Sequence, residues 1–238
     1  MNAVAICGDW HGDARFARKM IKTLSSRGIT EILHCGDFGY GWDADYIPNI
    51  DESLNKHGMT LRWVPGNHEN YDEIDLLYDH DAQRMGMNGT IYVLRRGERF
   101  MIGATSFVGI GGGHSIDKDR RTQGVSWWPQ ELITTGDVYR IMTTHRECDV
   151  VIAHDAPLTA DLDLRNGYKD DPHSIGNRRL LGIIVDHLDP LFVFHGHYHQ
   201  RHSTKDHLDR VVIGLSDNRD WFNNNFVIFD CDDKKVIE

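Results

Sequence analysis

Residues 3–13 have the sequence AVAICGDWHGD, and this stretch decides the fold. Its first five residues, Ala3–Cys7, are an apolar run of strand length, and Asp9 and His11 follow directly. Asp13 can then cap a helix, because apolar residues recur after it at helical spacing. These residues are Phe16, Ala17, Met20, Ile21 and Leu24. A buried strand, a polar turn and an amphipathic helix in succession predict an α/β protein.

Four more apolar runs end, like the first, in side chains that can bind a metal ion or transfer a proton. Asp37 follows Glu31–Cys35, Asn67-His68-Glu69 follows Leu61–Val64, His154-Asp155 follows Val150–Ala153, and His197 and His199 follow Leu191–Phe194. Glycines beside these groups allow sharp turns and close backbone approach. Ligands of open α/β sheets bind at the carboxyl ends of the strands. We therefore expect the polar groups of all five segments to meet at one place.

The rest of the chain predicts further strands and helices. Two paired strands are expected over Ile91–Leu94 and Arg99–Val108, and a glycine-rich loop is expected from Gly109. Helices are predicted near Pro129–Met142 and over Ile175–Leu188, and closing strands over Val211–Leu215 and Phe226–Phe229. The sequence contains no internal repeat and no linker-like tract. We therefore expect one domain over residues 1–238, with an insert at about 109–130 that borders the site.

The composition argues against several classes of protein. The formal net charge of −10 disfavours a long nucleic acid as the main partner, since neutralising phosphates requires a basic surface. No apolar run is long enough to span a bilayer, and residues 1–7 lack the basic start and long apolar core of a signal peptide. The four cysteines form no C-x-x-C pair. We therefore expect a cytoplasmic protein that has neither a membrane nor a long nucleic acid as its main partner.

The strand-end residues offer carboxylate, amide and imidazole donors without thiolate. This set suits divalent manganese, iron or zinc, and manganese is the ion we favour. Two such ions about 3.5–4 Å apart can hold a phosphate group and lower the pKa of a bound water from ~15.7 towards about 7. Asp37 stands alone in its segment, and its two oxygens can bridge a pair of ions. We therefore expect two divalent metal ions as cofactors.

The five blocks together resemble those of the calcineurin-like metallophosphoesterases. The family pattern is Gly-Asp-x-His, Gly-Asp, Gly-Asn-His-Asp/Glu, a single histidine after a strand, and Gly-His-x-His. All five blocks occur here in this order between residues 8 and 199. The resemblance implies an α/β sandwich of two packed mixed β-sheets flanked by helices.

The resemblance also implies a role for each matching residue. One metal ion would be held by Asp9, His11 and His199, and the other by Asn67, His154 and His197, with Asp37 bridging the two. His68 would act as general acid or transition-state stabiliser, oriented by a carboxylate. Glu69 stands where aspartate is commoner in the family, and Ala153 stands where glycine often precedes the single histidine.

The function implied is hydrolysis of phosphodiesters or phosphomonoesters, with small cyclic nucleotides as the favoured substrates. A protein phosphatase is the first alternative, and a nuclease, which needs a basic groove, is the second. The third is a scaffold that keeps the fold without the chemistry. Scaffolds of this kind usually lose metal ligands, whereas every ligand position is filled here.

The segment from Gly109 to Arg121 is not explained by these motifs. Its glycines can let the backbone pass close to an ion or a ligand. We predict that His114 and one of the two arginines, Arg120 or Arg121, contact the substrate, since guanidinium groups bind phosphate oxygens through paired donors. The alternative is a flexible surface loop in which the charged residues 117–121 are solvated.

Overall fold

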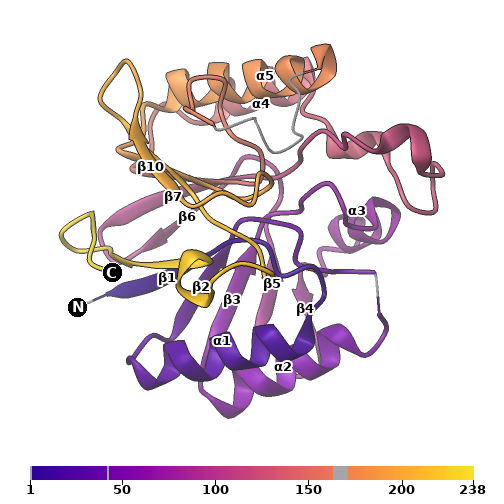
Figure 1. The fold of residues 1–238 in the computed structure, drawn as a ribbon, viewed down its shortest axis with the longest axis vertical. Helices are drawn as coiled ribbons and strands as arrows, with labels where there is room; N and C mark the ends of the chain where they lie inside the picture. The colour runs from indigo at the N-terminus through magenta and orange to yellow at the C-terminus, as the bar shows by residue number, and fades with distance from the viewer. Residues whose placement is uncertain (1, 42, 163–170) are drawn as a thin grey trace.

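The computed structural model describes residues 2–41, 43–162 and 171–238. Figure 1 shows four layers: helices α1 and α2, a first sheet, a second sheet, and helices α4 and α5. This arrangement confirms the expected pair of packed mixed sheets flanked by helices. In the part of the chain that is described, no helix is long and apolar enough to cross a membrane.

Two sheets form the centre of the molecule. The first has the strand order β13-β12-β1-β2-β3-β5-β4 and the second the order β10-β11-β9-β8-β7-β6. The strands of the first are β1 (Ala3–Cys7), β2 (Glu31–His34), β3 (Thr60–Trp63), β4 (Arg84–Met85), β5 (Ile91–Val93), β12 (Phe226–Asp230) and β13 (Lys235–Val236). Those of the second are β6 (Glu98–Ile102), β7 (Thr105–Ile110), β8 (Val150–Ala153), β9 (Phe192–His195), β10 (His202–Lys205) and β11 (Val211–Gly214).

Helices cover the outer faces of the two sheets (Figure 1). The α-helices of the described residues are α1 (Ala14–Ser26), α2 (Tyr46–Lys56), α3 (Tyr71–Asp79), α4 (Thr135–Thr144) and α5 (Pro172–Leu188). Short 3₁₀ turns are η1 (Lys118–Arg120), η2 (Pro129–Glu131) and η4 (Phe222–Asn224). As predicted, Asp13 caps α1, because its carboxylate accepts the N–H of Phe16 at 2.9 Å.

The hydrophobic core has three parts, one between each pair of layers. Alternate residues of a strand point to opposite faces, so each central strand contributes to two parts of the core. In β1, Ala5 and Cys7 pack beneath the helices, whereas Val4 and Ile6 pack between the sheets. This double burial explains why the central strands are continuous apolar runs.

The predicted pairing of Ile91–Leu94 with Arg99–Val108 is wrong. Strand β5 pairs in parallel with β3 in the first sheet, whereas β6 pairs with β7 in the second. Residues 99–108 form two antiparallel strands, because Gly103 adopts a positive φ of 57° and turns the chain. Residues 94–97 therefore carry the chain from one sheet to the other.

Two further boundaries differ from the prediction. The expected helix near Pro129–Met142 is a 3₁₀ turn and a separate α4, because Thr134 starts a new helix through a capping box with Asp137. Gly109 is not in a loop but within β7, where an added Cβ would approach Val64 and Leu94 of the facing layer. The glycine-rich loop begins at Gly111.

The direction of the strands determines where the predicted metal-binding residues lie. In the first sheet, β1, β2, β3 and β5 run parallel, and in the second β7, β8, β9 and β11 do so. The carboxyl ends of the two sets meet, since Nδ1 of His154, after β8, lies 2.8 Å from the carbonyl oxygen of Cys35, after β2. All the predicted metal-binding residues follow strands of these two sets.

Candidate metal centre

Asp37 lies at the middle of the site, and its two carboxylate oxygens face different histidines. Oδ2 is 3.5 Å from Nε2 of His11, and Oδ1 is 3.5 Å from Nε2 of His154. Asp37 is buried, and its backbone adopts a φ of 49°. The carboxylate therefore divides the site into two halves, as a bridging ligand would.

The first half contains Asp9, His11 and His199. Their candidate donor atoms all lie within 4.8 Å of one another, and Nε2 of His199 is 3.1 Å from Oδ2 of Asp9. The rings of the two histidines are perpendicular, with centroids 5.0 Å apart. The structure thus brings together the three residues expected around one ion.

The second half contains Asn67, His154 and His197. Oδ1 of Asn67 lies 2.9 Å from Nε2 of His154, and the ring centroids of the two histidines are 4.9 Å apart. The donor atoms of Asp9, Asp37 and His154 also lie within 4.8 Å of one another, so the two halves are contiguous.

The backbone of the site adopts uncommon conformations. His11, Asp37, His197 and His199 have positive φ angles between 46° and 65°. Positive φ is uncommon for residues other than glycine, and such conformations cluster at functional sites. Glycine is required beside them: an added Cβ at Gly66 would collide with the carboxylate of Asp37.

Nδ1 of His199 lies 3.3 Å from Oδ2 of Asp217 and 3.0 Å from Nη2 of Arg219. Each of two other histidines directs one ring nitrogen into the site while an oxygen holds the other from behind. Nδ1 of His154 faces the Cys35 carbonyl at 2.8 Å, and Nδ1 of His11 faces Oδ1 of Asn218 at 3.1 Å. An oxygen that only accepts fixes the proton on Nδ1 and leaves the lone pair on Nε2. Metal-binding histidines are oriented in this way.

The donor set fits a cation. With its Nδ1 proton held by the Cys35 carbonyl, a neutral His154 would present a lone pair to Oδ1 of Asn67 and Oδ1 of Asp37. Three converging acceptors repel one another unless positive charge lies among them. The pKa of His11 responds to the same field. Burial lowers the pKa of His11, but the hydrogen bond that His11 donates to Asp37 and the charges of Asp37 and Asp9 raise it to about 9.

Asp217 and Asn218 are site residues that the sequence interpretation missed. They follow strand β11, which runs parallel to β9, so a sixth strand end reaches the site. The signal was available, because the predicted strand Val211–Leu215 ends two residues before Asp217. The other blocks contain histidine or glycine beside the polar group, whereas residues 216–218 contain neither.

His68 lies at the open side of the site. Its Nε2 is 4.0 Å from Oδ2 of Asp37 and 2.8 Å from Nη2 of Arg121. Burial lowers the pKa of His68, and Arg121 lowers it further, against the charge of Asp37. The carboxylate of Glu69, the next residue, accepts the backbone N–H groups of Gly39 and Gly66. Its role is to hold the two loops that carry Asp37 and Asn67.

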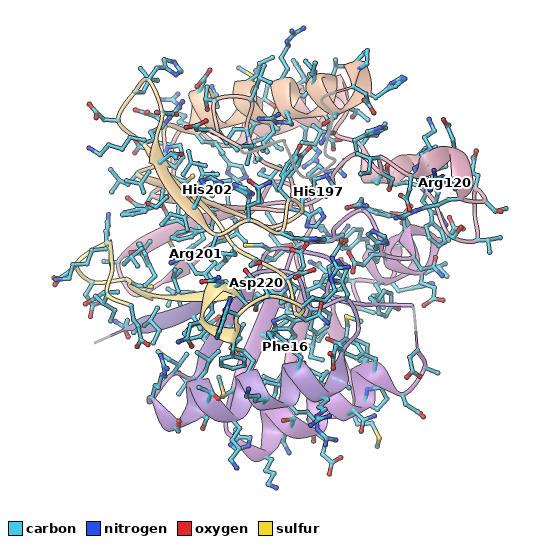
Figure 2. All side chains as sticks on the ribbon, in the orientation of Figure 1. Phe16, Arg120, His197, Arg201, His202 and Asp220 are labelled. Carbon is cyan, nitrogen blue, oxygen red and sulfur yellow. The ribbon has the colours of Figure 1, made fainter. Side chains whose placement is uncertain are left out.

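The three residues predicted to contact substrate lie in different environments. Arg121 is nearly buried, with 9% of its side chain exposed, and it also pairs with Asp117 at 2.8 Å. Arg120 is exposed and lies well apart from His197 (Figure 2). His114 is buried, and its Nε2 is 3.1 Å from Oδ2 of Asp171 at the start of α5. Substrate contact by these residues stays a prediction.

Two sheets with a cluster of carboxylate, amide and imidazole donors at their strand ends define a candidate metal-binding protein. A family model described as calcineurin-like phosphoesterase matches residues 3–201. The chain therefore belongs to the calcineurin-like phosphoesterase family and is a hydrolase of phosphate esters.

Solved structures share the fold at low sequence identity. The protein TT1561 of Thermus thermophilus has a TM-score of 0.61 and 11% identity, with 99% of this chain and 96% of that chain covered. A dimetal phosphatase from Danio rerio has a TM-score of 0.61 and 13% identity, with 95% and 91% covered. A comparison with curated protein sequences finds no match.

Proposed function

We propose that this protein hydrolyses small phosphodiesters or phosphomonoesters with two divalent metal ions, manganese being favoured. The observation that carries the proposal is the position of Asp37. One of its oxygens faces His11 and the other faces His154, each at 3.5 Å. Such a division is what a bridging carboxylate between two ions requires.

The ligand set divides accordingly. Asp9, His11 and His199 would hold one ion, Asn67, His154 and His197 would hold the other, and Asp37 would contribute to both. When bound, such ions supply Lewis acidity toward the phosphoryl group and make a water molecule more acidic. Carbonyl and carboxamide groups behind the imidazoles keep the donor nitrogens directed inward.

His68 and Arg121 act on the substrate from the open side. His68 is close to Asp37 without being enclosed by the ligand set, so it can donate a proton to the leaving oxygen. Arg121 presents a guanidinium group beside the same imidazole, where it can bind a phosphoryl oxygen. The phosphate would thus lie between the two ions and these two side chains.

The space beside His68 favours a small substrate. A pocket of 340 Å³ is lined there by Gly41, His68, Asn70, Asp117, Arg121, Val125, Ser126 and Trp128. Pockets for small molecules commonly start at about 300 Å³. A mononucleotide is of this scale, and the net charge of −10 disfavours a polymer of phosphates. We therefore favour small cyclic nucleotides over phosphoproteins and nucleic acids.

A metal-reconstitution assay tests the proposal. The chelated protein is supplied with Mn²⁺, Fe²⁺ or Zn²⁺ and assayed on bis-p-nitrophenyl phosphate, p-nitrophenyl phosphate, a panel of cyclic nucleotides, a phosphopeptide and single-stranded DNA. We expect no turnover without metal, restoration with two equivalents, and the highest kcat/KM on a cyclic nucleotide. Turnover that survives chelation would contradict the metal-dependent mechanism. Preference for a phosphopeptide or for single-stranded DNA would select the phosphatase or nuclease alternative.

A further inference from the structure

A hydrogen-bonded relay connects Asn67 to a buried carboxylate in the segment that follows β7. Nδ2 of Asn67 donates to Oγ of Ser115 at 3.1 Å, and Oγ of Ser115 donates to Oε2 of Glu131 at 2.7 Å. The backbone N–H of Ser115 donates to Oε1 of the same carboxylate at 2.8 Å. At most 4% of each of these three residues is exposed.

The relay has a fixed direction. An ionised carboxylate only accepts hydrogen bonds, so both the N–H and the O–H of Ser115 are directed at Glu131. The hydroxyl oxygen of Ser115 then has only lone pairs left, and it can only accept from Asn67. The amide of Asn67 must therefore place its nitrogen toward Ser115 and its oxygen toward His154, where Oδ1 lies 2.9 Å from Nε2.

Orientation matters because the two ends of an asparagine amide have opposite chemistry. The oxygen can bind a divalent cation, whereas the –NH₂ group is a donor and cannot. A flip of Asn67 by half a turn would replace a metal ligand by two N–H groups. A buried asparagine without a fixed partner has both orientations available.

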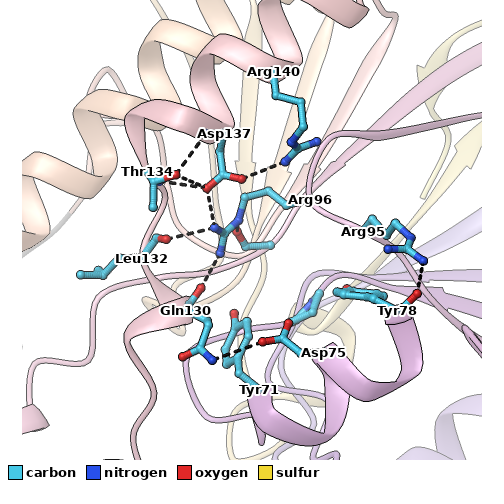
Figure 3. Close-up of a pocket in the computed structure, with 12 residues that line it drawn as sticks. Tyr71, Asp75, Tyr78, Arg95, Arg96, Gln130, Leu132, Thr134, Asp137 and Arg140 are labelled. Carbon is cyan, nitrogen blue, oxygen red and sulfur yellow. Dashed lines mark hydrogen bonds and ion pairs between the residues drawn. The ribbon is translucent and has the colours of Figure 1, made fainter. Parts of the chain in front are cut away.

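Glu131 is itself held in place by Arg96, which lies in the pocket shown in Figure 3. The guanidinium of Arg96 donates to the carbonyl oxygens of Gly111, Gln130 and Leu132 at 2.9, 2.8 and 3.0 Å. It also pairs with Asp137 at 2.9 Å. One partly buried cation thus joins the two ends of the segment that supplies Ser115 and Glu131.

We propose that Glu131, acting through Ser115, is the positioning group that sets the amide of Asn67 for metal binding. The inference rests on the proposed two-metal function, because it concerns a ligand of the second ion. It assigns a role to the insert that sequence motifs do not carry: the insert orients a ligand in addition to bordering the site. Partners of this kind typically change metal affinity by about 10–100-fold.

Calorimetric titration of the metal-free protein with Mn²⁺ tests the relay directly. The titration is done at pH 8, because burial raises the pKa of Glu131 to about 7, although hydrogen bonds from Ser115 lower it. The variants are Ser115→Ala and Glu131→Gln. Glutamine keeps the shape of Glu131, but its amide donates to Ser115 and so frees the hydroxyl to donate to a flipped Asn67. We expect either variant to weaken one of two binding events by about tenfold or more.

Ser106→Ala is the matched control, since the hydroxyl of Ser106 also donates to a carboxylate, that of Asp149. Ser106 lies near the start of β7, whereas Ser115 follows the end of this strand. It should bind both ions with wild-type affinity. Two ions bound with unchanged affinity in Ser115→Ala and Glu131→Gln, both folded by circular dichroism, would overturn the relay alone. A wild-type protein that binds fewer than two ions would overturn the proposed function, and the relay with it.

Discussion

Nη2 of Arg121 lies 2.8 Å from Nε2 of His68, although 53 positions separate the two residues in sequence. The contact joins the segment after β7 to the turn after β3, and it places a permanent positive charge beside the imidazole. Oδ1 of Asp117 lies 2.8 Å from the same Nη2. Arg121 is therefore held in a defined position at the open side of the metal centre.

Substitution of Arg121 should affect substrate and leave the metals in place. We expect Arg121→Ala to lower kcat/KM by about tenfold or more, equivalent to about 1.4 kcal/mol, because one donor pair to the phosphate is lost. Arg120→Ala is the matched control, since Arg120 is the adjacent residue and its side chain is exposed and lies apart from His197 of the site (Figure 2). Steady-state kinetics and metal analysis of both variants decide the matter. Equal kinetics for the two would refute a substrate role for Arg121.

Substitution of His68 should remove proton transfer. General acids contribute ~10²–10⁴-fold in rate, which is about 3–5 kcal/mol of barrier at about 1.36 kcal/mol per tenfold. We expect His68→Ala to lose activity on this scale with two ions still bound. The loss should shrink as the leaving group becomes more acidic, which a series of substituted phenyl esters measures. A variant that lacks an ion would show that His68 is a ligand.

Substitution of Asp37 should remove the bridge. An amide carries no charge to hold two cations together, so Asp37→Asn should lose metal and turnover in parallel. Elemental analysis and kinetics on one preparation measure both. Asp51→Asn provides a control, because Asp51 is equally buried but serves the turn at Thr90, 3.0 Å away. Full occupancy with normal turnover in Asp37→Asn would remove this residue from the mechanism.

The sequence predicted the parts of the site in which each group directly follows its own strand. An apolar run gives the strand, and the next few residues must then lie at its carboxyl end, whatever the neighbouring strands do. Asp9, Asp37 and His154 could be placed together on that basis. The same rule applied to Val211–Leu215 would have found Asp217.

Contacts that depend on how distant segments pair were not accessible in this way. Strands β5 and β6 are close in sequence, which favours a hairpin, but their partners β3 and β7 belong to different sheets. Glu131 lies in a segment with helical composition, and nothing local indicates that its carboxylate reaches Ser115, 16 positions earlier. Both results depend on contacts between separate segments of the chain, which single-segment patterns do not encode.

The carboxylate behind His199 should control the affinity of the first ion. Oδ2 of Asp217 lies 3.3 Å from Nδ1 of His199 and also accepts from Arg219, whose Nη2 lies 3.0 Å from the same Nδ1. We expect Asp217→Asn to weaken one Mn²⁺ binding event by about 10–100-fold, because the imidazole loses orientation and basicity. Titration of the metal-free variant measures this. Combination with Ser115→Ala should then weaken both events, whereas weakening of a single event in the double variant would place the two residues at the same ion.

The ion pair between Asp137 and Arg96 should stabilise the fold in a pH-dependent manner. Burial raises the pKa of Asp137, but Arg96 and Thr134 lower it to about 2, below the ordinary value of about 3.9 in an unfolded chain. A lowered native pKa stabilises the fold above about pH 4, and this contribution is lost as the pH falls toward 2. We expect Asp137→Asn to lower the free energy of unfolding by about 2 kcal/mol at pH 6. The difference from wild type should narrow by pH 3 in urea titrations of the metal-free proteins.

Asp81→Asn is the control, because it breaks an exposed pair with Arg95; it should lower the free energy of unfolding by less than about 1 kcal/mol. A difference for Asp137→Asn that stays constant with pH would show that Asp137 acts through the hydrogen bonds of the capping box with Thr134, and not through its charge.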